Sequence, residues 1–331
     1  MSTDSTLLLQ RQDVAALLSL EECMDAVEQA FCLHAQEKAP TPKVIGLHSD
    51  NGGFHIKAGI LELKRPYFVA KMNANFPGNP KLLGLSTIQG IVIVCDAENG
   101  RLLALMDSIE LTIIRTGAAT GVAAKYLSPA NATVATICGC GNQGTVSLKA
   151  LRKVRNLEKV FAFDVENTQA EKLREQSGTE VEIVTVDVND LPQAIKQSQI
   201  IVTCTPSKTP FLHPKDVCPG SFIAAVGADS EDKQELFAEL VASSKVVTDI
   251  TNQSVSIGEL HHALNQGLMT VAQVHAQLGE IIAGKKPGRE SDKEIIVFDS
   301  TGTALQDVAA AAIVYEKAIV NRVGKKLDFA A

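Results

Sequence analysis

The chain has 331 residues, of which 45% are hydrophobic and 21% are charged, and its formal net charge is −7. This length is sufficient for two domains with hydrophobic cores, and this composition is typical of soluble globular proteins rather than disordered or fibrous ones. The acidic balance argues against nucleic acid or a membrane surface as a partner, because binding to either requires an excess of Lys and Arg on one face.

Residues 1–14 and the cysteines predict a cytoplasmic protein. The stretch MSTDSTLLLQRQDV has neither the basic segment nor the long apolar run of a signal peptide, and no part of the chain has the ~18 consecutive apolar residues of a membrane span. The seven cysteines are an odd number and lie mostly in apolar runs, which favours a reducing compartment. Cys138 and Cys140 have no second pair at zinc-finger spacing, so we interpret them as small residues of a tight turn and expect no metal site.

The first third of the chain predicts a helix over residues 18–36, followed by antiparallel strands. The strand-like stretches lie at 53–60, 67–75, 86–96 and 102–108. Turns at Pro77-Gly78 and Asn99-Gly100 suit antiparallel pairing of these strands. A helix that begins near Asp107 or Ser108 is expected next.

From Thr133 onward, short apolar runs alternate with amphipathic helical segments, as in parallel βαβ units. The predicted strands lie at 133–138, 159–164, 181–186, 199–205, 221–227, 245–250 and 294–300. A last helix, over 302–323, has the apolar periodicity to return to the first part of the chain. We therefore predict an α/β protein with a Rossmann-type doubly wound sheet. This NAD-binding domain, residues 118–304, is inserted into an α+β substrate-binding and dimerisation domain formed by 1–117 and 305–331.

The sequence GCGNQG (139–144) follows a predicted strand directly and opens a predicted helix. Gly139, Gly141 and Gly144 have the spacing of a dinucleotide-binding turn, in which glycines make the turn, admit the pyrophosphate and let helix and strand pack closely. Asn142 and Gln143 begin the helix, whose backbone N–H groups would face the phosphates. The alternative is a tight turn that binds no ligand.

Asp164 ends the second of these strands, where an acidic side chain would bind the adenosine ribose and repel a 2′-phosphate, which favours NAD over NADP. Its alternative role is to cap the helix that begins near Asn167. Four residues at the ends of later strands are further candidates for cofactor contacts: Thr205, Ser207, Val226 and Ser300. Ser and Thr at strand ends are also common turn formers.

Asp229 follows the strand at 221–227, at the edge where doubly wound sheets bind their reacting ligands. Apolar surroundings would raise the pKa of its carboxyl group and suit proton exchange with an amine or imine. An N-cap of a helix through Lys233 and Leu240 is the alternative.

Three cationic residues of the first domain are candidates for an anion site. Arg115 lies in an apolar helix, where a guanidinium is costly without an anionic partner. Lys57 and Lys71 lie on strand-like stretches among apolar residues, and either can instead extend its ammonium group to solvent.

Long segments of the chain resemble the ornithine cyclodeaminase/mu-crystallin family. They are PTPK (40–43), AKMNANFPGNP (70–80), STIQG (86–90), ALMDSIELTIIRTGAATGVAAKYL (104–127), GCGNQG (139–144), VGADSEDKQEL (226–236) and GRESDKEIIVFDSTGTALQDVAAAAIVYEKA (288–318). The archaeal-type alanine dehydrogenases of that family are especially similar over the last of these. The resemblance implies a homodimer that pairs through the sheets of its first domains, with NAD(P) on the inserted Rossmann domain and substrate in the cleft between the domains.

Matched residue by residue, the family's carboxylate-binding lysine falls on Lys71 and its arginine on Arg115, while its catalytic aspartate falls on Asp229. Lys71 is therefore expected to have both a binding and a catalytic role. The family's second carboxylate-binding arginine, in a Pro-x-Arg motif, falls on Lys43, and an ammonium cannot bind two oxygens as a guanidinium fork does. Many members have a Met-Pro-Ala stretch where this chain reads Ile56-Lys57-Ala58, so Lys57 is an added positive charge.

The leading hypothesis is an NAD(H)-dependent reductase of small α-imino acids, which runs in reverse as an amino-acid dehydrogenase. Together Lys43, Lys57, Lys71 and Arg115 could hold a second carboxylate, so we hypothesise a dicarboxylic imine such as iminosuccinate. The alternatives are an ornithine or lysine cyclodeaminase that recycles NAD, and a non-catalytic NAD(P)-binding protein like the crystallins. Five histidines have no assigned role: His55, His213, His261, His262 and His275.

Overall fold

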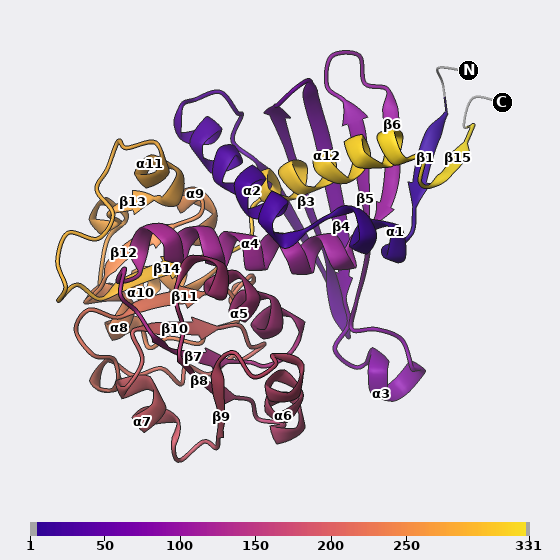
Figure 1. Ribbon diagram of the computed structural model, residues 1–331. Helices are drawn as coiled ribbons and strands as arrows, with labels where there is room; N and C mark the ends of the chain where they lie inside the picture. The colour runs from indigo at the N-terminus through magenta and orange to yellow at the C-terminus, as the bar shows by residue number, and fades with distance from the viewer. Residues whose placement is uncertain (1–4, 329–331) are drawn as a thin grey trace. The chain divides into compact units, whose positions relative to one another are not determined.

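The computed structural model describes residues 5–328, which divide into two compact units (Figure 1). The first unit comprises the chain up to Arg115 together with the residues from Thr303 onward, and the second unit is Thr116–Gly302. The first junction lies inside helix α4 (Ile109–Leu127), and the second immediately precedes helix α12 (Ala304–Asn321). Domain boundaries had been expected at 117/118 and 304/305.

The first unit contains a seven-stranded sheet in the order β15-β1-β6-β5-β4-β3-β2. The strands are β1 (Thr6–Leu9), β2 (Lys43–Ser49), β3 (Gly52–Glu62), β4 (Pro66–Asn75), β5 (Ile88–Asp96), β6 (Leu102–Asp107) and β15 (Lys325–Leu327). All neighbours are antiparallel except β1 and β6. The four predicted strands are confirmed as β3 to β6. The turn predicted at Pro77-Gly78 is present, and helix α3 (Asn79–Leu83) follows it in the β4–β5 connection.

One face of this sheet is covered by helices. Helix α12 lies across β3, β4 and β5 and packs against α2 (Leu20–Ala35), while α1 (Arg11–Leu17) lies beside β6 (Figure 1). Gly59 of β3 brings the strand close to α12, since a Cβ atom there would lie 3.2 Å from the Cβ of Ala304. The apolar side chains on the covered face are fully buried: Leu61, Tyr67, Val69, Val92 and Val94.

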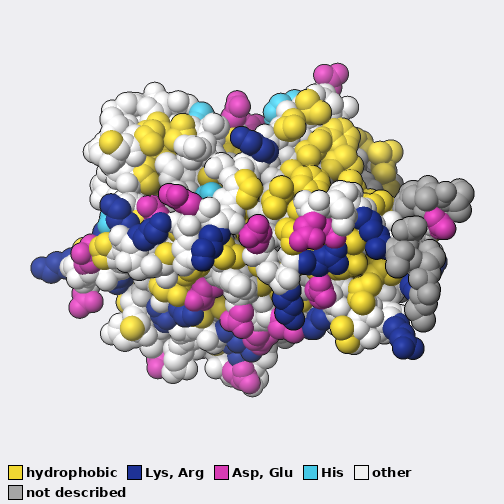
Figure 2. All heavy atoms as spheres, turned by 90° about the horizontal axis from the view of Figure 1, so that it is seen from above, with side chains coloured by type: hydrophobic (Ala, Val, Ile, Leu, Met, Phe, Trp, Pro, Cys, Tyr) yellow, Lys and Arg dark blue, Asp and Glu magenta, His cyan; other side chains and the backbone are white. Residues whose placement is uncertain are grey.

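The opposite face of the sheet also carries apolar side chains, several of which are exposed. Because paired residues of antiparallel strands point to the same face, Ile45, Ile56, Met72 and Ile91 form one row there. Four large hydrophobic side chains on this face are exposed: Ile45, Leu47, Phe54 and Met72. Figure 2 shows hydrophobic side chains gathered over this unit.

The second unit contains an eight-stranded sheet in the order β13-β12-β14-β11-β10-β7-β8-β9, and all its strand pairs are parallel. The strands are β7 (Val134–Cys138), β8 (Lys159–Phe163), β9 (Glu182–Val186), β10 (Ile200–Thr203), β11 (Phe222–Ala225), β12 (Lys245–Thr248), β13 (Ala276–Gln277) and β14 (Ile296–Asp299). The strand order reverses between β7 and β10, as in a Rossmann-type doubly wound sheet. The predicted fold class is therefore confirmed.

Helices connect these strands. They are α5 (Asn142–Val154), α6 (Asn167–Gln176), α7 (Leu191–Lys196), α8 (Ala238–Ala242), α9 (Thr251–Ser254), α10 (Glu259–Asn265) and α11 (Leu278–Ile282), with 3₁₀ turns at Pro214–Asp216 and Val271–Gln273. Every residue of β10, β11 and β14 is buried, because helices cover both faces of a parallel sheet. Within residues 5–328, no helix is both long and apolar enough to cross a membrane.

Candidate active site

The glycine-rich turn between β7 and α5 requires glycine at two of its positions. Gly139 has φ = +98°, and a Cβ atom on it would lie 2.9 Å from the carbonyl oxygen of Cys204 at the end of β10. A Cβ atom on Gly144 would overlap the carbonyl oxygen of Gly139. These two glycines therefore allow the tight turn and the close packing of α5 on β7.

Gly141 has a different reason to be glycine. A Cβ atom there would meet no other atom within 4 Å, so the turn is open on that side. Gly141 is also the N-cap residue of α5, and no side chain caps the helix. The N–H groups of Asn142 and Gln143 and the positive end of the helix dipole are therefore placed to bind an anion, and this turn fits a dinucleotide pyrophosphate.

Asp164 directly follows β8 and is tied to the glycine-rich turn. One carboxylate oxygen accepts a hydrogen bond from the backbone N–H of Cys140 at 2.8 Å, and the other accepts from the N–H of Glu166 at 2.9 Å. Glu166, not Asp164, occupies the N-cap position of α6, so the helix-cap alternative for Asp164 is wrong.

The four other candidate cofactor residues lie just after β10, β11 and β14, and only one of them is shown to lie beside this turn. Thr205 lies beside it, since its methyl carbon would be 3.1 Å from a Cβ atom on Gly139. The hydroxyl of Ser207 donates to the carbonyl of Thr209 at 2.7 Å, so Ser207 is used in its own turn. Val226 and Ser300 continue the parallel sheet through their backbone N–H groups, which donate to Thr203 and Ala225.

Glu235 is a residue of this region that the sequence did not reveal. Its carboxylate is fully buried and accepts hydrogen bonds from the backbone of Thr205 and Gly227. The motif KQEL marks its position, but nothing local indicates that this acid turns inward.

In the first unit, three cationic side chains surround one carboxylate; we call Lys57, Lys71, Arg115 and Asp307 the cation cluster. Lys57 and Lys71 are directly paired on β3 and β4 and point to the face covered by α12. Their exposed fractions are 5% and 2%, and that of Arg115 is 6%. Lys71 donates to Asp307 at 2.7 Å, and the Nε atom of Arg115 lies 3.1 Å from the same carboxylate oxygen.

Two residues of α12 complete this arrangement, and sequence reasoning missed both. Asp307 is fully buried in the first turn of the helix, and Gln306 accepts a hydrogen bond from Arg115 at 2.7 Å. A polar pair in the otherwise apolar stretch ALQDVAAAA was the available signal.

The ionisable groups of the cation cluster alter one another's pKa values. Burial, together with the positive charges of Arg115 and Lys57, lowers the pKa of Lys71 to about 7, although Asp307 opposes this change. Burial by itself would raise the pKa of Asp307, but Lys71 and Arg115 hold it below its usual value. Three cations facing one carboxylate leave an excess of positive charge, which an anionic ligand would neutralise.

Lys43 is not brought into the cation cluster. It pairs with Ala58 in the β2–β3 ladder, whereas Lys57 pairs with Val44, so strand alternation directs Lys43 to the other face of the sheet. Its side chain is exposed. Sequence matching could not detect this difference, because it depends on strand register.

Asp229 lies in the loop after β11 of the second unit. Its carboxylate accepts a hydrogen bond from the ammonium of Lys233 at 2.6 Å, and its side chain is 40% exposed, so the apolar surroundings expected from the sequence are absent. The N-cap alternative is also wrong, since no helix passes through Lys233 and α8 begins only at Ala238.

Four of the histidines with no assigned role have structural contacts. His213 stacks on Phe237 with ring centroids 3.8 Å apart, and His261, His262 and His275 each lie within hydrogen-bond distance of a backbone carbonyl. His55 pairs with Asn73 on β3 and β4, and its ring lies 6.5 Å from that of His48. In the described part of the chain, no group of three or more His, Cys, Asp or Glu side chains has the arrangement of a metal site.

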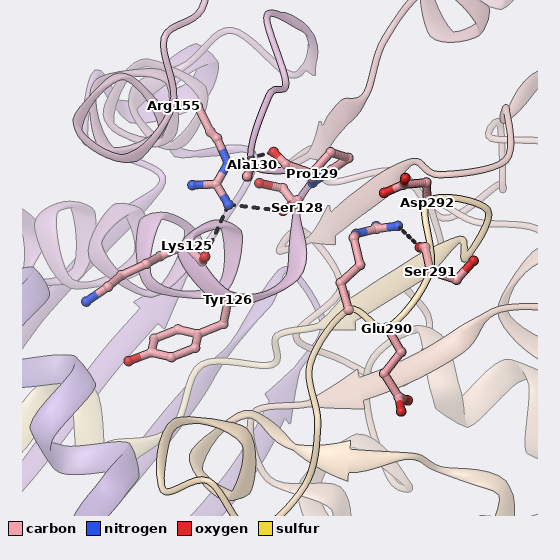
Figure 3. Close-up of a pocket in the computed structure, with 10 residues that line it drawn as sticks. Lys125, Tyr126, Ser128, Pro129, Ala130, Arg155, Glu290, Ser291 and Asp292 are labelled. Atoms are coloured by element: carbon pink, nitrogen blue, oxygen red, sulfur yellow. Dashed lines mark hydrogen bonds between the residues drawn. The ribbon is translucent and has the colours of Figure 1, made fainter.

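A cavity of about 570 Å³ lies at the end of α4, lined by Lys125, Tyr126, residues 128–130, Arg155 and residues 289–292 (Figure 3). It is at the amino-terminal edge of the parallel sheet, opposite the edge that carries the glycine-rich turn. Arg155 donates to the carbonyls of Ala124, Ser128 and Pro129, and Arg289 donates to that of Leu127. Because these guanidinium groups bind the last carbonyls of α4, the cavity is part of a structural anchor.

Comparisons with known proteins agree with this geometry. The model of the ornithine cyclodeaminase/mu-crystallin family matches residues 4–321. The chain is 41% identical to an alanine dehydrogenase of Archaeoglobus fulgidus over 98% of both chains. It is 34% identical to an iminosuccinate reductase of Paracoccus denitrificans over 97% of this chain and 99% of the relative. An archaeal alanine dehydrogenase, solved as a dimer with bound NAD, superposes with a TM-score of 0.93 at 40% identity, over 98% of this chain and 99% of that one.

Proposed function

The chain belongs to the ornithine cyclodeaminase/mu-crystallin family, and we propose that it is an NAD(H)-dependent oxidoreductase that reduces α-imino acids and oxidises α-amino acids. The cation cluster is the observation that carries this proposal. A fold rarely buries three cations unless an anion accompanies them, and the common feature of these substrates is an α-carboxylate.

The cofactor is NAD, held by the second unit. The open side of Gly141 and the uncapped start of α5 accept the pyrophosphate, while Asp164 disfavours the 2′-phosphate of NADP. When bound, NADH supplies the hydride that reduces the imine carbon.

Lys71 and Arg115 bind the substrate carboxylate and thereby orient the α-carbon. The guanidinium of Arg115 already has two partners on α12, so its direction is fixed before substrate arrives. Because the guanidinium is already oriented, its side chain loses little conformational freedom when the substrate binds, and this contributes to catalysis.

Asp229 exchanges a proton with the substrate nitrogen. Reduction of the imine adds a hydride to carbon and a proton to nitrogen, and the partly exposed carboxylate can renew its proton from water. Lys233 beside it stabilises the ionised form that remains after proton transfer. Lys71 is the second candidate for proton exchange, because its pKa of about 7 lies near physiological pH.

The substrate is a dicarboxylic imine, as in the iminosuccinate reductase of Paracoccus denitrificans. One α-carboxylate neutralises one positive charge of the cation cluster. A second carboxylate on the substrate would neutralise the further charge that Lys57 adds.

The protein is a homodimer that pairs through the open face of the first unit's sheet. This face presents the exposed apolar side chains of Ile45, Leu47, Phe54 and Met72, and the related archaeal alanine dehydrogenase is a dimer. The seven free thiols suit a reducing cytoplasm.

The activity is tested with purified protein, oxaloacetate or pyruvate plus ammonia, and NADH or NADPH in separate reactions. We expect NADH to be consumed, with oxaloacetate preferred. A cyclodeaminase instead releases ammonia from ornithine or lysine with no net change in NADH absorbance, and a non-catalytic crystallin-like protein binds NADH without turnover. Either result rejects the proposal.

The role of Asp229 is tested with Asp229→Asn. Turnover should fall by about 100-fold or more while NADH binding persists, since general acid–base groups contribute about 10²–10⁴-fold. Asp232→Asn, which removes a nearby acid paired with Lys208, is the control and should retain its rate. Near wild-type turnover by Asp229→Asn would exclude this proton-transfer role.

The substrate class is tested with Lys57→Met. With ammonia present, kcat/KM for oxaloacetate should fall by about 10- to 100-fold and that for pyruvate much less, as for the loss of one charged hydrogen bond. Lys64→Met, at an exposed position before β4, is the control. Equal losses for both acids would show that Lys57 does not recognise a second carboxylate.

A further inference from the structure

The carboxylate of Glu235 joins the ends of two neighbouring strands of the second unit. One of its oxygens accepts hydrogen bonds from the backbone N–H of Thr205 at 2.6 Å and from the Thr205 hydroxyl at 2.7 Å. The other accepts from the N–H of Gly227 at 3.2 Å. Thr205 follows β10 and Gly227 follows β11, and these strands are paired. One side chain therefore fixes the distance between two loops.

Glu235 is itself held by further buried acids; we call Glu235, Glu259 and Asp299 the carboxylate series. Glu259 accepts hydrogen bonds from the backbone N–H groups of Glu235 and Leu236, at 2.8 and 3.1 Å. Asp299 accepts from those of Glu259 and Leu260, at 3.1 and 2.9 Å. Each acid thus binds two backbone N–H groups, and the series runs from the end of β14 to the ends of β10 and β11.

Burial of the carboxylate series lowers the stability of the fold, because carboxylates lose their hydration there. All three acids are fully buried, and burial raises the pKa of Glu235 and Glu259 and that of Asp299 to about 7. A neutral side chain would hold two loops with a smaller desolvation penalty, but it cannot accept hydrogen bonds at both of its polar atoms as a carboxylate does. The structure therefore maintains a carboxylate where several donors converge.

The loops that Glu235 fixes adjoin the glycine-rich turn. Thr205 lies beside Gly139, and a Cβ atom on Gly227 would overlap the Glu235 carboxylate. Strands β7, β10 and β11 are consecutive in the sheet, so their carboxyl ends form one border, where open α/β sheets bind their ligands.

From these contacts we infer that Glu235 is a positioning residue of the cofactor site, which sets the loops after β10 and β11 against the glycine-rich turn. Its hydrogen bonds are to Thr205 and Gly227, and it acts through the two loops that carry them. The inference rests on the proposed use of NAD.

The test compares Glu235→Gln with the wild type by direct titration of NADH, followed by fluorescence. The new amide donor faces the N–H of Gly227 or the donors of Thr205, so the loops separate and the Kd for NADH rises by about tenfold or more, as for a lost charged hydrogen bond. The KM for the oxo acid at saturating NADH should stay within about twofold, because the cation cluster is unchanged.

Two further variants separate positioning from general destabilisation. Asp216→Asn alters another buried acid of this unit, at the 3₁₀ turn Pro214–Asp216, and should lower the melting temperature without changing the Kd for NADH. Gly227→Ala displaces the carboxylate from the other side and should raise the Kd, even if Glu235→Gln does not fold.

The outcomes are distinguishable. A wild-type protein that binds neither NADH nor NADPH rejects the proposed function and, with it, this inference. If the wild type binds NADH and both Glu235→Gln and Gly227→Ala bind it equally well, only the inference is overturned. An equal rise in Kd for Asp216→Asn also overturns it, since a general loss of stability would then explain the effect.

Discussion

Lys71 lies between two other cations and a single carboxylate, and this position makes substrate binding sensitive to pH. Its pKa is lowered to about 7 by burial, Arg115 and Lys57. A carboxylate binds the protonated ammonium, so affinity is present below this pKa and is lost as the pH rises through it. We predict that kcat/KM for the oxo acid falls above pH 7, as a profile at saturating NADH would show.

The variant Lys57→Met tests whether Lys71 causes this fall in kcat/KM. Removal of a like charge raises the pKa of Lys71, so the fall in kcat/KM should move to higher pH. Lys64→Met should leave the profile in place. If the fall stays where it is in Lys57→Met, another group causes it.

Individual residues were predicted from the sequence to different extents. Arg115, Lys71 and Lys57 were recognisable because cations in apolar segments are unusual. Their partner Asp307 lies 236 positions from Lys71 along the chain, and no local pattern connects the two. The prediction that Lys43 joins these cations is wrong for a related reason, since strand register decides on which face of the sheet its side chain lies.

The glycine-rich turn shows how neighbouring glycines within one element serve separate purposes. We predict that Gly141→Ala folds normally but binds NADH at least about tenfold more weakly, because its methyl group projects into open space that the pyrophosphate needs. Gly144→Ala should instead lower the melting temperature, because its methyl group overlaps the Gly139 carbonyl. Thermal unfolding and NADH titration of both variants measure this; the reverse pattern would contradict it.

Helix α4 depends on side chains from distant parts of the chain at its carboxyl end. Arg155→Ala removes the donor to the carbonyl of Ser128 and one of the donors to those of Ala124 and Pro129, which should cost about 1–3 kcal/mol of unfolding free energy. Arg174→Ala, which removes an exposed pair with Glu171, should cost less than about 0.5 kcal/mol. Denaturant unfolding compares the two, and equal losses would argue against the anchoring role of Arg155.

Apolar runs and amphipathic helices were predictable, whereas strands β1, β2, β13 and β15 were not. The central strands of the second unit, β7, β10, β11 and β14, are continuous apolar runs, which distinguish them from the amphipathic helices between them. Strands β1 and β15 have four and three residues, too few to show a period. In β2 all residues are exposed, so burial does not impose a pattern on its sequence.

The molecule as a whole should associate through its open sheet face. We predict that Ile45→Asp with Phe54→Asp converts a dimer into a monomer, because two charges on an apolar surface of this kind cannot be buried without partners. Light scattering at several protein concentrations measures the mass. Val188→Asp, at an exposed position of the second unit, is the control. A doubly substituted protein that remains a dimer would place the interface elsewhere.

Strand β1 pairs with β15, Thr6 opposite Leu327, and this ties completion of the first unit to the synthesis of residues 303–327, which follow the whole second unit. While the ribosome is still translating, residues 116–302 can emerge and fold as a set, but the early strands must wait for β15 and α12. Until α12 appears, Lys57, Lys71 and Arg115 have no Asp307 to neutralise them. The nascent polypeptide therefore acquires its nucleotide-binding half before its acid-binding half, and a message truncated after residue 302 would encode the former whole but the latter without α12 and β15.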